Sequence, residues 1–178
     1  NKQIQDIVKQ KNDKLDIILK KIKITLDPLN FEISAKTIDA KIIFKGKLIE
    51  LEYIKTQISL NSLIKNQLAA SQVEISTKSI LLKNFVSFAR SINSRPELFF
   101  LERFIQKGYL IADLELNFDE FGVLKNDYKV NGLLRDSKIN LFKKNKLEKI
   151  NFLFNITGNS FNFKDISFDY NNINFLSE

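Results

Sequence analysis

The stretch GYLIADLELNFD at residues 108–119 decides the fold class, because its apolar and polar side chains alternate. Leu114 and Leu116, for example, are separated by the charged Glu115. A period of two residues places successive side chains on opposite faces of a β-strand. The stretch therefore predicts a strand with one apolar and one polar face.

The same alternation continues toward the C-terminus. After a turn at 119–122, the pattern predicts a return strand at 128–134 and further strands within 152–156 and 161–175. A break in the alternation near Asp165 predicts a β-bulge. Because the connections are short, neighbouring strands are expected to pair antiparallel.

Toward the N-terminus, residues 22–83 show a similar series of short alternating stretches and predict a first β meander. Residues 1–21 carry apolar side chains mostly at helical spacing and predict an amphipathic helix. Between the two meanders, residues 84–107 predict a helical insert, with Asn84 as its N-cap and Gly108 as its stop signal.

These elements predict a single module over residues 1–178, with the second meander at 108–178. The expected fold class is mainly β with a minor α component. We expect a long, curved antiparallel meander that forms a half-pipe or groove, with an N-terminal helix and a short helical insert. The chain has no initial Met and opens within a polar helical pattern, so we expect it to be a segment of a longer protein.

The composition excludes several kinds of chemistry. The chain has no His, Cys, Met or Trp. Without His and Cys there can be no Ser-His-Asp or Cys-His catalysis and no zinc site built on those ligands. We therefore expect no catalytic residue, no metal and no cofactor. No apolar run approaches the roughly 20 residues that span a bilayer. The net charge of +7 needs discounting, because Lys, Asn and Ile are overused together and their AT-rich codons place Lys on any solvated surface. Only the remainder of the charge favours an anionic membrane surface or acidic lipid head groups.

The apolar face of such a sheet must be covered by something. A second sheet, a helix or a ligand such as an acyl chain can cover it. Sixteen Phe residues make this face strongly apolar, while the insert at 84–107 is too short to cover a ten-stranded meander. A long single layer curls because strands twist, so both a closed core and an open trough are compatible with the pattern.

Several stretches resemble the strands of AsmA-like proteins, a family that includes the related TamB group. They share apolar-polar strand spacing and short consensus phrases rather than a catalytic signature. They are ITLDPLNFEI (24–33), KLIELEYI (47–54), ISLNSLI (58–64), VEIS (73–76), GYLIADLELNFD (108–119) and YKVNG (128–132).

The resemblance implies a function. AsmA-like proteins are anchored in the bacterial inner membrane, extend across the periplasm and are similar to bridge-like lipid-transfer proteins, in which a β groove carries phospholipid. The resemblance therefore implies that this chain is a non-enzymatic groove module on the periplasmic side of the cell envelope and that it serves outer-membrane maintenance. Its partners would be phospholipid or another acyl lipid, adjacent β modules of the same chain, and the inner membrane through a helix outside this segment.

No site residue transfers from the family one by one, so the candidate lipid-facing positions come from the alternation. They share an apolar side chain on the expected apolar face of a strand or beside a turn. They are Ile24, Leu26, Phe31, Ile33, Leu51, Ile58, Leu60, Val73, Ile75, Leu114, Leu116, Phe118, Val130, Phe152, Phe154 and Ile156.

Two other functions are compatible with the sequence. The first is a structural or interaction module that aids outer-membrane protein assembly by pairing through an edge strand. The second is a binder of nucleic acid or another acidic polymer, suggested by the basic cluster Arg135, Lys138, Lys143, Lys144 and Lys146. Nucleic-acid surfaces usually interleave aromatic and basic side chains, whereas here the Phe residues segregate to one face, so the sequence argues against nucleic acid.

Pairs of neighbouring carboxylates raise the question of acid-base catalysis. Asp113 and Glu115 lie two residues apart, and Asp119 precedes Glu120. Acid-base catalysis needs one raised and one ordinary pKa in an enclosed site. Asp113 and Glu115 are expected on the polar, solvated face of a strand, so we expect no catalytic role for them.

Overall fold

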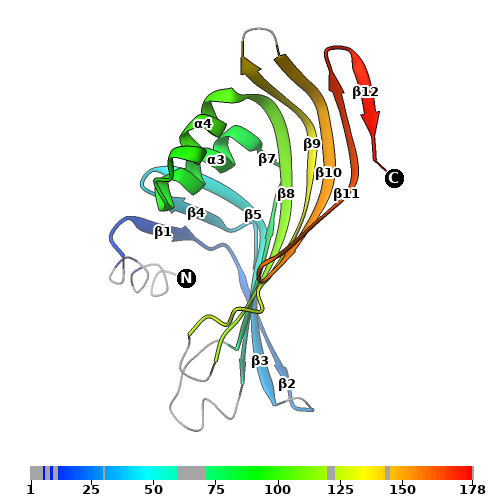
Figure 1. Ribbon diagram of the computed structural model, residues 1–178. Helices are drawn as coiled ribbons and strands as arrows, with labels where there is room; N and C mark the ends of the chain where they lie inside the picture. Colours follow the sequence, from blue (N-terminus) through cyan, green and yellow to red (C-terminus); the bar gives the residue numbers. More distant parts are fainter. Residues whose placement is uncertain are drawn as a thin grey trace.

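The computed structural model describes residues 6, 9, 12–29, 31–59, 71–119, 123–142 and 145–177. Within them, twelve strands form one antiparallel sheet, confirming the predicted mainly-β fold class (Figure 1). The strands are β1 (Leu15–Ile18), β2 (Ile22–Asp27), β3 (Glu32–Ile38), β4 (Lys41–Phe44), β5 (Lys47–Ser59), β6 (Gln72–Thr77), β7 (Ile80–Leu81), β8 (Ile105–Asn117), β9 (Lys129–Phe142), β10 (Asn145–Thr157), β11 (Ser160–Tyr170) and β12 (Ile173–Leu176).

The strands follow one another across the sheet almost in sequence order. The main path runs β1-β4-β5-β6-β8-β9-β10-β11-β12. The long strand β5 forks the sheet, because its first half pairs with β4 and its second half with β3, which in turn pairs with β2. From β8 onward each strand pairs with the next one along the chain, as expected of a meander.

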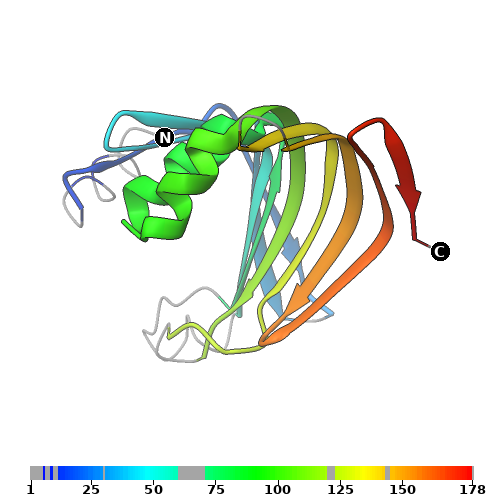
Figure 2. The same cartoon turned by 45° about the horizontal axis from the view of Figure 1, so that its top comes forward.

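The sheet is strongly curved, and the two described helices lie on its concave side. Figures 1 and 2 show β8 to β11 curving in one direction, with α3 (Leu82–Ile92) and α4 (Pro96–Phe104) on the concave side. The helices stand near β4, β5 and β8 and leave the β11–β12 side uncovered. The predicted groove with a short helical insert is therefore the observed architecture.

A line of backbone irregularities bends the sheet across β8 to β11. Gly108, Asp136, Lys149 and Asp165 all have positive φ, between 49° and 139°, and lie where the strand register shifts. An extra residue in one strand bends it and increases its twist. We call these four residues the bend line. Asp165 confirms the bulge predicted from the sequence.

The prediction of one helix over residues 1–21 is wrong in its second half. Asp6 and Lys9 are helical, but Leu15–Ile18 is strand β1, and most of the first eleven residues lie outside the described part. Strand β1 pairs with β4, with Ile17 opposite Ile42. The backbone groups along the edge of β4 are satisfied by this long-range pairing, which overrides a weak helical pattern.

The helical insert is confirmed, but its ends are shifted. Helix α3 begins at Leu82 without a side-chain cap, so Asn84 is not its N-cap. Helix α4 ends at Phe104, and Ile105 already belongs to β8. Gly108 is therefore not a helix stop. Its positive φ serves the bend line instead, where Cα of Ser137 would lie only 3.0 Å from an added Cβ.

Two small clusters of buried side chains hold the module together. The first contains Ala40, Ile49, Leu51 and Ile80, and the second Leu110, Leu134 and Ile150. Phe85 of α3 packs against both clusters, so this helix is the cover that closes them. The chain exposes 12256 Å² of surface, whereas a compact monomer of 20.7 kDa would expose about 8,900 Å². The chain thus exposes more surface than a compact monomer of its mass, as expected of a single-layer sheet with a small core.

An ion-pair cluster at the β3–β4 turn makes the stability of this end depend on pH. Oδ1 of Asp39 lies 2.5 Å from Nζ of Lys78, and Oδ2 lies 3.0 Å from Nζ of Lys20. Hydrogen bonds from Lys78 and then Lys20 lower the pKa of Asp39 from 3.8 to about 2. A lowered pKa stabilises the fold above pH 3.8, and that contribution is lost as the pH falls from 3.8 toward 2.

We therefore expect Asp39→Asn to be less stable than the wild type above pH 4 and to lose less stability between pH 4 and 2. Urea denaturation at a series of pH values measures this difference. Lys78→Gln removes the stronger hydrogen bond and should reproduce part of the effect. If the free energy of unfolding of the wild type and of Asp39→Asn fell equally between pH 4 and 2, the lowered pKa of Asp39 would be contradicted.

Candidate functional site

The strand register gathers the predicted apolar positions on one face of the sheet. Directly paired residues share a face, and one row runs Ile75–Leu114–Val130–Ile156–Phe161 across β6, β8, β9, β10 and β11. Helix α3 packs on this same face, against Leu110 and Leu134. We call it the trough face, because it is the concave side of the sheet.

A second row shows how the backbone makes room for aromatic rings. It runs Ala112–Gly132–Phe154–Phe163. A Cβ on Gly132 would lie 2.5 Å from Cε1 of Phe154, so only glycine allows that ring to lie where it does. Phe152 forms an edge contact with Phe163, with ring centroids 5.5 Å apart. Phe152, Phe154 and Phe163 thus form an aromatic cluster on the trough face of β10 and β11.

The register places most of the sixteen candidate positions on the trough face. These are Ile24, Leu26, Ile33, Ile58, Val73, Ile75, Leu114, Leu116, Val130, Phe152, Phe154 and Ile156.

Four candidates differ from the rest. Leu51 is on the same face but is only 1% exposed, because the first cluster and α3 enclose it, so its assignment as lipid-facing is wrong. Phe31 lies in the turn before β3 with a positive φ and is not a strand residue. Phe118 follows β8 and forms an isolated bridge with Leu124. Leu60 lies outside the described residues.

Sequence reasoning omitted the aromatic residues of β11 and β12 from the candidates. Phe161 and Phe163 are on the trough face and are 60% and 53% exposed. Phe168 stacks on Phe175 of β12, with centroids 5.0 Å apart. The alternation of these residues was visible in the sequence, but the break at Asp165 concealed that the residues on both sides of the bulge share a face.

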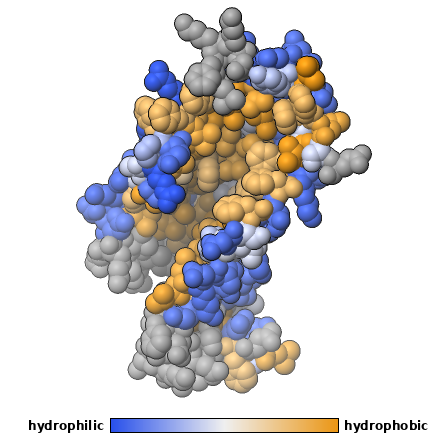
Figure 3. Space-filling view, in the orientation of Figure 1, coloured by the Kyte–Doolittle hydropathy of each residue, from blue (hydrophilic) through white to orange (hydrophobic). Residues whose placement is uncertain are grey.

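The trough is closed under α3 and open away from it. Leu82 and Phe85 pack over the second cluster, whereas Phe161, Phe163 and Phe175 are exposed. Figure 3 shows a continuous apolar surface in the hollow beside the helices. The helices thus cover only part of the apolar face, and several exposed rings remain available for contact with a ligand.

The opposite face of the sheet carries paired polar side chains beside one apolar row, Ile111–Leu133–Leu153, across β8, β9 and β10. Nζ of Lys129 lies 3.3 Å from Oε1 of Glu115, and the amide of Asn155 donates to Oδ1 of Asn131 at 2.6 Å. Asp113 pairs with Asn131 in the register and so also points away from the trough. Asp113 and Glu115 are therefore on the solvated face, as the alternation predicted. Glu120 lies outside the described residues.

The basic cluster expected at the β9–β10 turn is only partly described. Lys143 and Lys144 lie outside the described residues. Lys138 forms an ion pair with Glu148, and its hydrogen bond lowers the pKa of that carboxyl. Arg135 lies 3.5 Å from Asp136. Acidic neighbours thus neutralise part of the charge on which polymer binding would depend.

Within the described residues, no group of three or more acidic side chains is arranged to hold a metal ion. In the same residues, no helix has the length and hydrophobicity that crossing a bilayer requires. A scan against protein-family models finds no family that matches this chain, and a search of curated proteins finds no matching relative.

Proposed function

We propose that this chain is a non-enzymatic β-groove module that binds the acyl chains of phospholipid along its trough face. The observation that carries the proposal is the row Ile75–Leu114–Val130–Ile156–Phe161, which crosses five strands without a polar interruption. Phe161 is 60% exposed, and the other four side chains are half-buried. A contiguous, partly exposed apolar surface of this kind usually marks an interaction site.

The dimensions support an acyl chain as the occupant. Five strands enclose four spacings of about 4.8 Å, so the row spans roughly 19 Å. One leaflet of a bilayer core is about 15 Å thick, which is the reach of ordinary acyl chains. Each CH₂ group that moves from water onto the trough gains about 0.8 kcal/mol, so partition alone supplies the affinity.

Passive partition also allows movement along the trough. Aliphatic and aromatic side chains follow one another in adjacent rows, so an acyl chain exchanges similar contacts at each step. The phosphate group stays at the solvated rim. No covalent step is required, and we propose no enzymatic activity.

The resemblance to AsmA-like proteins suggests a setting for this activity. We propose that the module is on the periplasmic side of a bacterial envelope, in a protein anchored in the inner membrane, and that it moves phospholipid between membranes for outer-membrane maintenance. Adjacent β modules of the same protein would continue the trough.

Replacing Phe163 with Asp tests the proposal directly. The ring is 53% exposed on the trough face, so its loss should not unfold the chain. Losing the contact of one Phe, about 1.5–3 kcal/mol, should weaken binding of a fluorescent fatty acid roughly ten- to hundredfold, and the added carboxylate opposes binding further. Fluorescence titration measures the affinity.

Leu153→Asp is the matched control. Leu153 is 42% exposed in the same part of the sheet, but its register partner is Lys164, on the opposite face. This variant should bind the fatty acid like the wild type. Equal weakening by the two substitutions, or a wild type that takes up no acyl lipid, would refute the proposal.

A second candidate function is edge-strand pairing during outer-membrane protein assembly. It is favoured by β2 and β12, each of which pairs on one side only within the described residues. Both carry exposed apolar residues, such as Leu26 and Leu176. Capture of an unfolded β-barrel strand by a chain that binds no acyl lipid would favour this function.

A further inference from the structure

A basic hollow lies at the corner between the β4–β5 hairpin and the two helices. Its volume is about 470 Å³, and its described lining contains four cations, Lys45, Lys47, Arg90 and Arg95, and no carboxylate. The hairpin contributes the lysines, and the junction of α3 and α4 contributes the arginines. Residues far apart in the sequence thus concentrate positive charge in one place.

Two of these cations are partly satisfied by other groups. Nζ of Lys45 donates to the carbonyl oxygen of Ser91 at 2.8 Å, which leaves its charge unneutralised. Nε of Arg90 lies 2.9 Å from Oε2 of Glu102. Among the described residues, Lys47 and Arg95 have no ion-pair partner. An anion would therefore meet at least two cations that are free to bind it.

A buried hydroxyl group also indicates that this hollow binds an anion. Ser87 is 8% exposed, its Oγ has no hydrogen-bond partner, and it lines this hollow. Buried polar groups are almost always paired, because an unpaired one is costly. Asn84, Ser87 and Ser91 follow one another at helical spacing and form the polar side of α3. A ligand oxygen that accepts from Ser87 would satisfy its hydroxyl.

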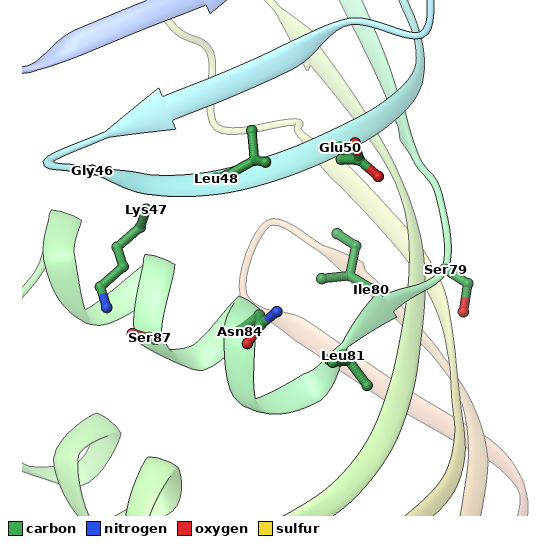
Figure 4. A pocket seen from close by; sticks show the side chains of 9 residues that line it. All are labelled: Gly46, Lys47, Leu48, Glu50, Ser79, Ile80, Leu81, Asn84 and Ser87. Carbon is green, nitrogen blue, oxygen red and sulfur yellow. The ribbon is translucent and has the colours of Figure 1, made fainter.

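The hollow adjoins a second one whose lining mixes polar and apolar side chains. This neighbour, about 420 Å³ in volume, shares Lys47 and Ser87 and extends to Leu48, Ile80 and Leu81. It also contains Glu50, whose carboxylate is paired with Lys41. Figure 4 shows Lys47 reaching from β5 toward α3, near Ser87 and Asn84. The cations thus gather at the corner, and the cleft beyond it has a mixed polar and apolar lining.

We propose that this corner binds the phosphate of a lipid head group, with Lys47 and Arg95 supplying the charge and Ser87 a hydrogen bond. Phosphate carries the acceptor oxygens that such a set of donors recognises. That the phosphate belongs to a lipid rests on the proposed function. A free phosphate compound has the same chemistry and is the alternative source.

The test compares two double variants of the full chain at constant ionic strength. Lys47→Gln/Arg95→Gln removes the two unpaired cations. Arg135→Gln/Lys164→Gln removes the same charge from the opposite face of the sheet. The probes are vesicles of phosphatidylcholine with phosphatidylglycerol, vesicles of phosphatidylcholine alone, and inorganic phosphate. Co-sedimentation and calorimetry measure binding.

We expect the wild type to prefer the vesicles that contain phosphatidylglycerol. The corner variant should bind them at least about tenfold more weakly, and the control variant less than about twofold, because exposed charges contribute little. Ser87→Ala should weaken binding by about threefold, the effect of one lost hydrogen bond. Equal losses in the two double variants would show diffuse attraction to the net charge and overturn the proposal.

Inorganic phosphate distinguishes the two sources. Binding that the corner variant loses for both probes, with phosphate displacing the vesicles, assigns the site to a lipid head group. Binding of inorganic phosphate alone, with the same sensitivity, assigns it to a free phosphate compound. If the wild type binds phosphate at the corner but takes up no fatty acid, the corner site stands and the proposed function falls. Fatty-acid uptake without any phosphate binding overturns only the corner site.

Discussion

Replacing Leu51 with Ala is expected to lower the free energy of unfolding by about 3 kcal/mol, within the 2–5 kcal/mol usual for buried Leu→Ala changes. Leu51 is 1% exposed and packs with Ala40, Ile49 and Ile80. The register shift after Leu51 turns it and Ile54 to the same face, where Phe85 and Phe88 of α3 close over them. The cavity would therefore open where the sheet and its helical cover meet.

This decrease in the free energy of unfolding is large relative to the total stability, because the core is small. Domains are usually stable by only about 5–15 kcal/mol, and the first cluster contains four buried residues among those described. Urea denaturation with an unchanged m-value measures the effect. Leu48→Ala is the control, because Leu48 is on the other face of β5 and is exposed; it should cost less than about 1 kcal/mol. Similar losses for the two variants would contradict the assigned core.

Gly108→Ala is expected to cost about 2–6 kcal/mol, because it combines backbone strain with a collision. Gly108 has a φ of 139°, a conformation that L-residues avoid at a cost of about 1–3 kcal/mol. The new Cβ would lie 2.8 Å from Cβ of Ser137 and 3.0 Å from its Cα, and Ser137 is completely buried. Overpacking of this kind costs about 1–3 kcal/mol more. Thermal or urea denaturation measures the change.

Two further variants separate the strain from the collision. Gly46→Ala introduces a Cβ at a φ of 74° with nothing within 4 Å, so only the strain remains. Adding Ser137→Gly to Gly108→Ala removes the side chain that is struck, and should recover part of the lost stability. A Gly108→Ala variant as stable as the wild type would show that the bend line does not require glycine there.

The alternation of apolar and polar residues predicted the sheet well, because it depends only on the residues within each strand. Where one face is apolar and the other polar, a strand can pair in only one register without exposing the wrong side chains. Leu114, Val130 and Ile156 were therefore assigned to one face before any pairing was known, and the register places them in one row. The bulge at Asp165 was also visible, because an extra residue interrupts the period of two.

The parts that sequence reasoning missed depend on distant partners. Leu15–Ile18 became a strand because the edge of β4 was available to it. The fork at β5 and the cover of Leu51 by α3 likewise arise from long-range contacts. The basic corner joins Lys47 to Arg95 through the folding of the insert, and no local pattern places these residues together.

The near-sequential order of the strands has a consequence for folding and for growth of the module. From β8 to β12, each strand pairs with the one before it, so each addition closes only a short loop and costs little chain entropy. Pairing between neighbours in the sequence favours assembly of this part hairpin by hairpin. As in repeat proteins, whose units contact only their neighbours, insertion of another hairpin would lengthen the half-pipe without rearranging the strands already in place.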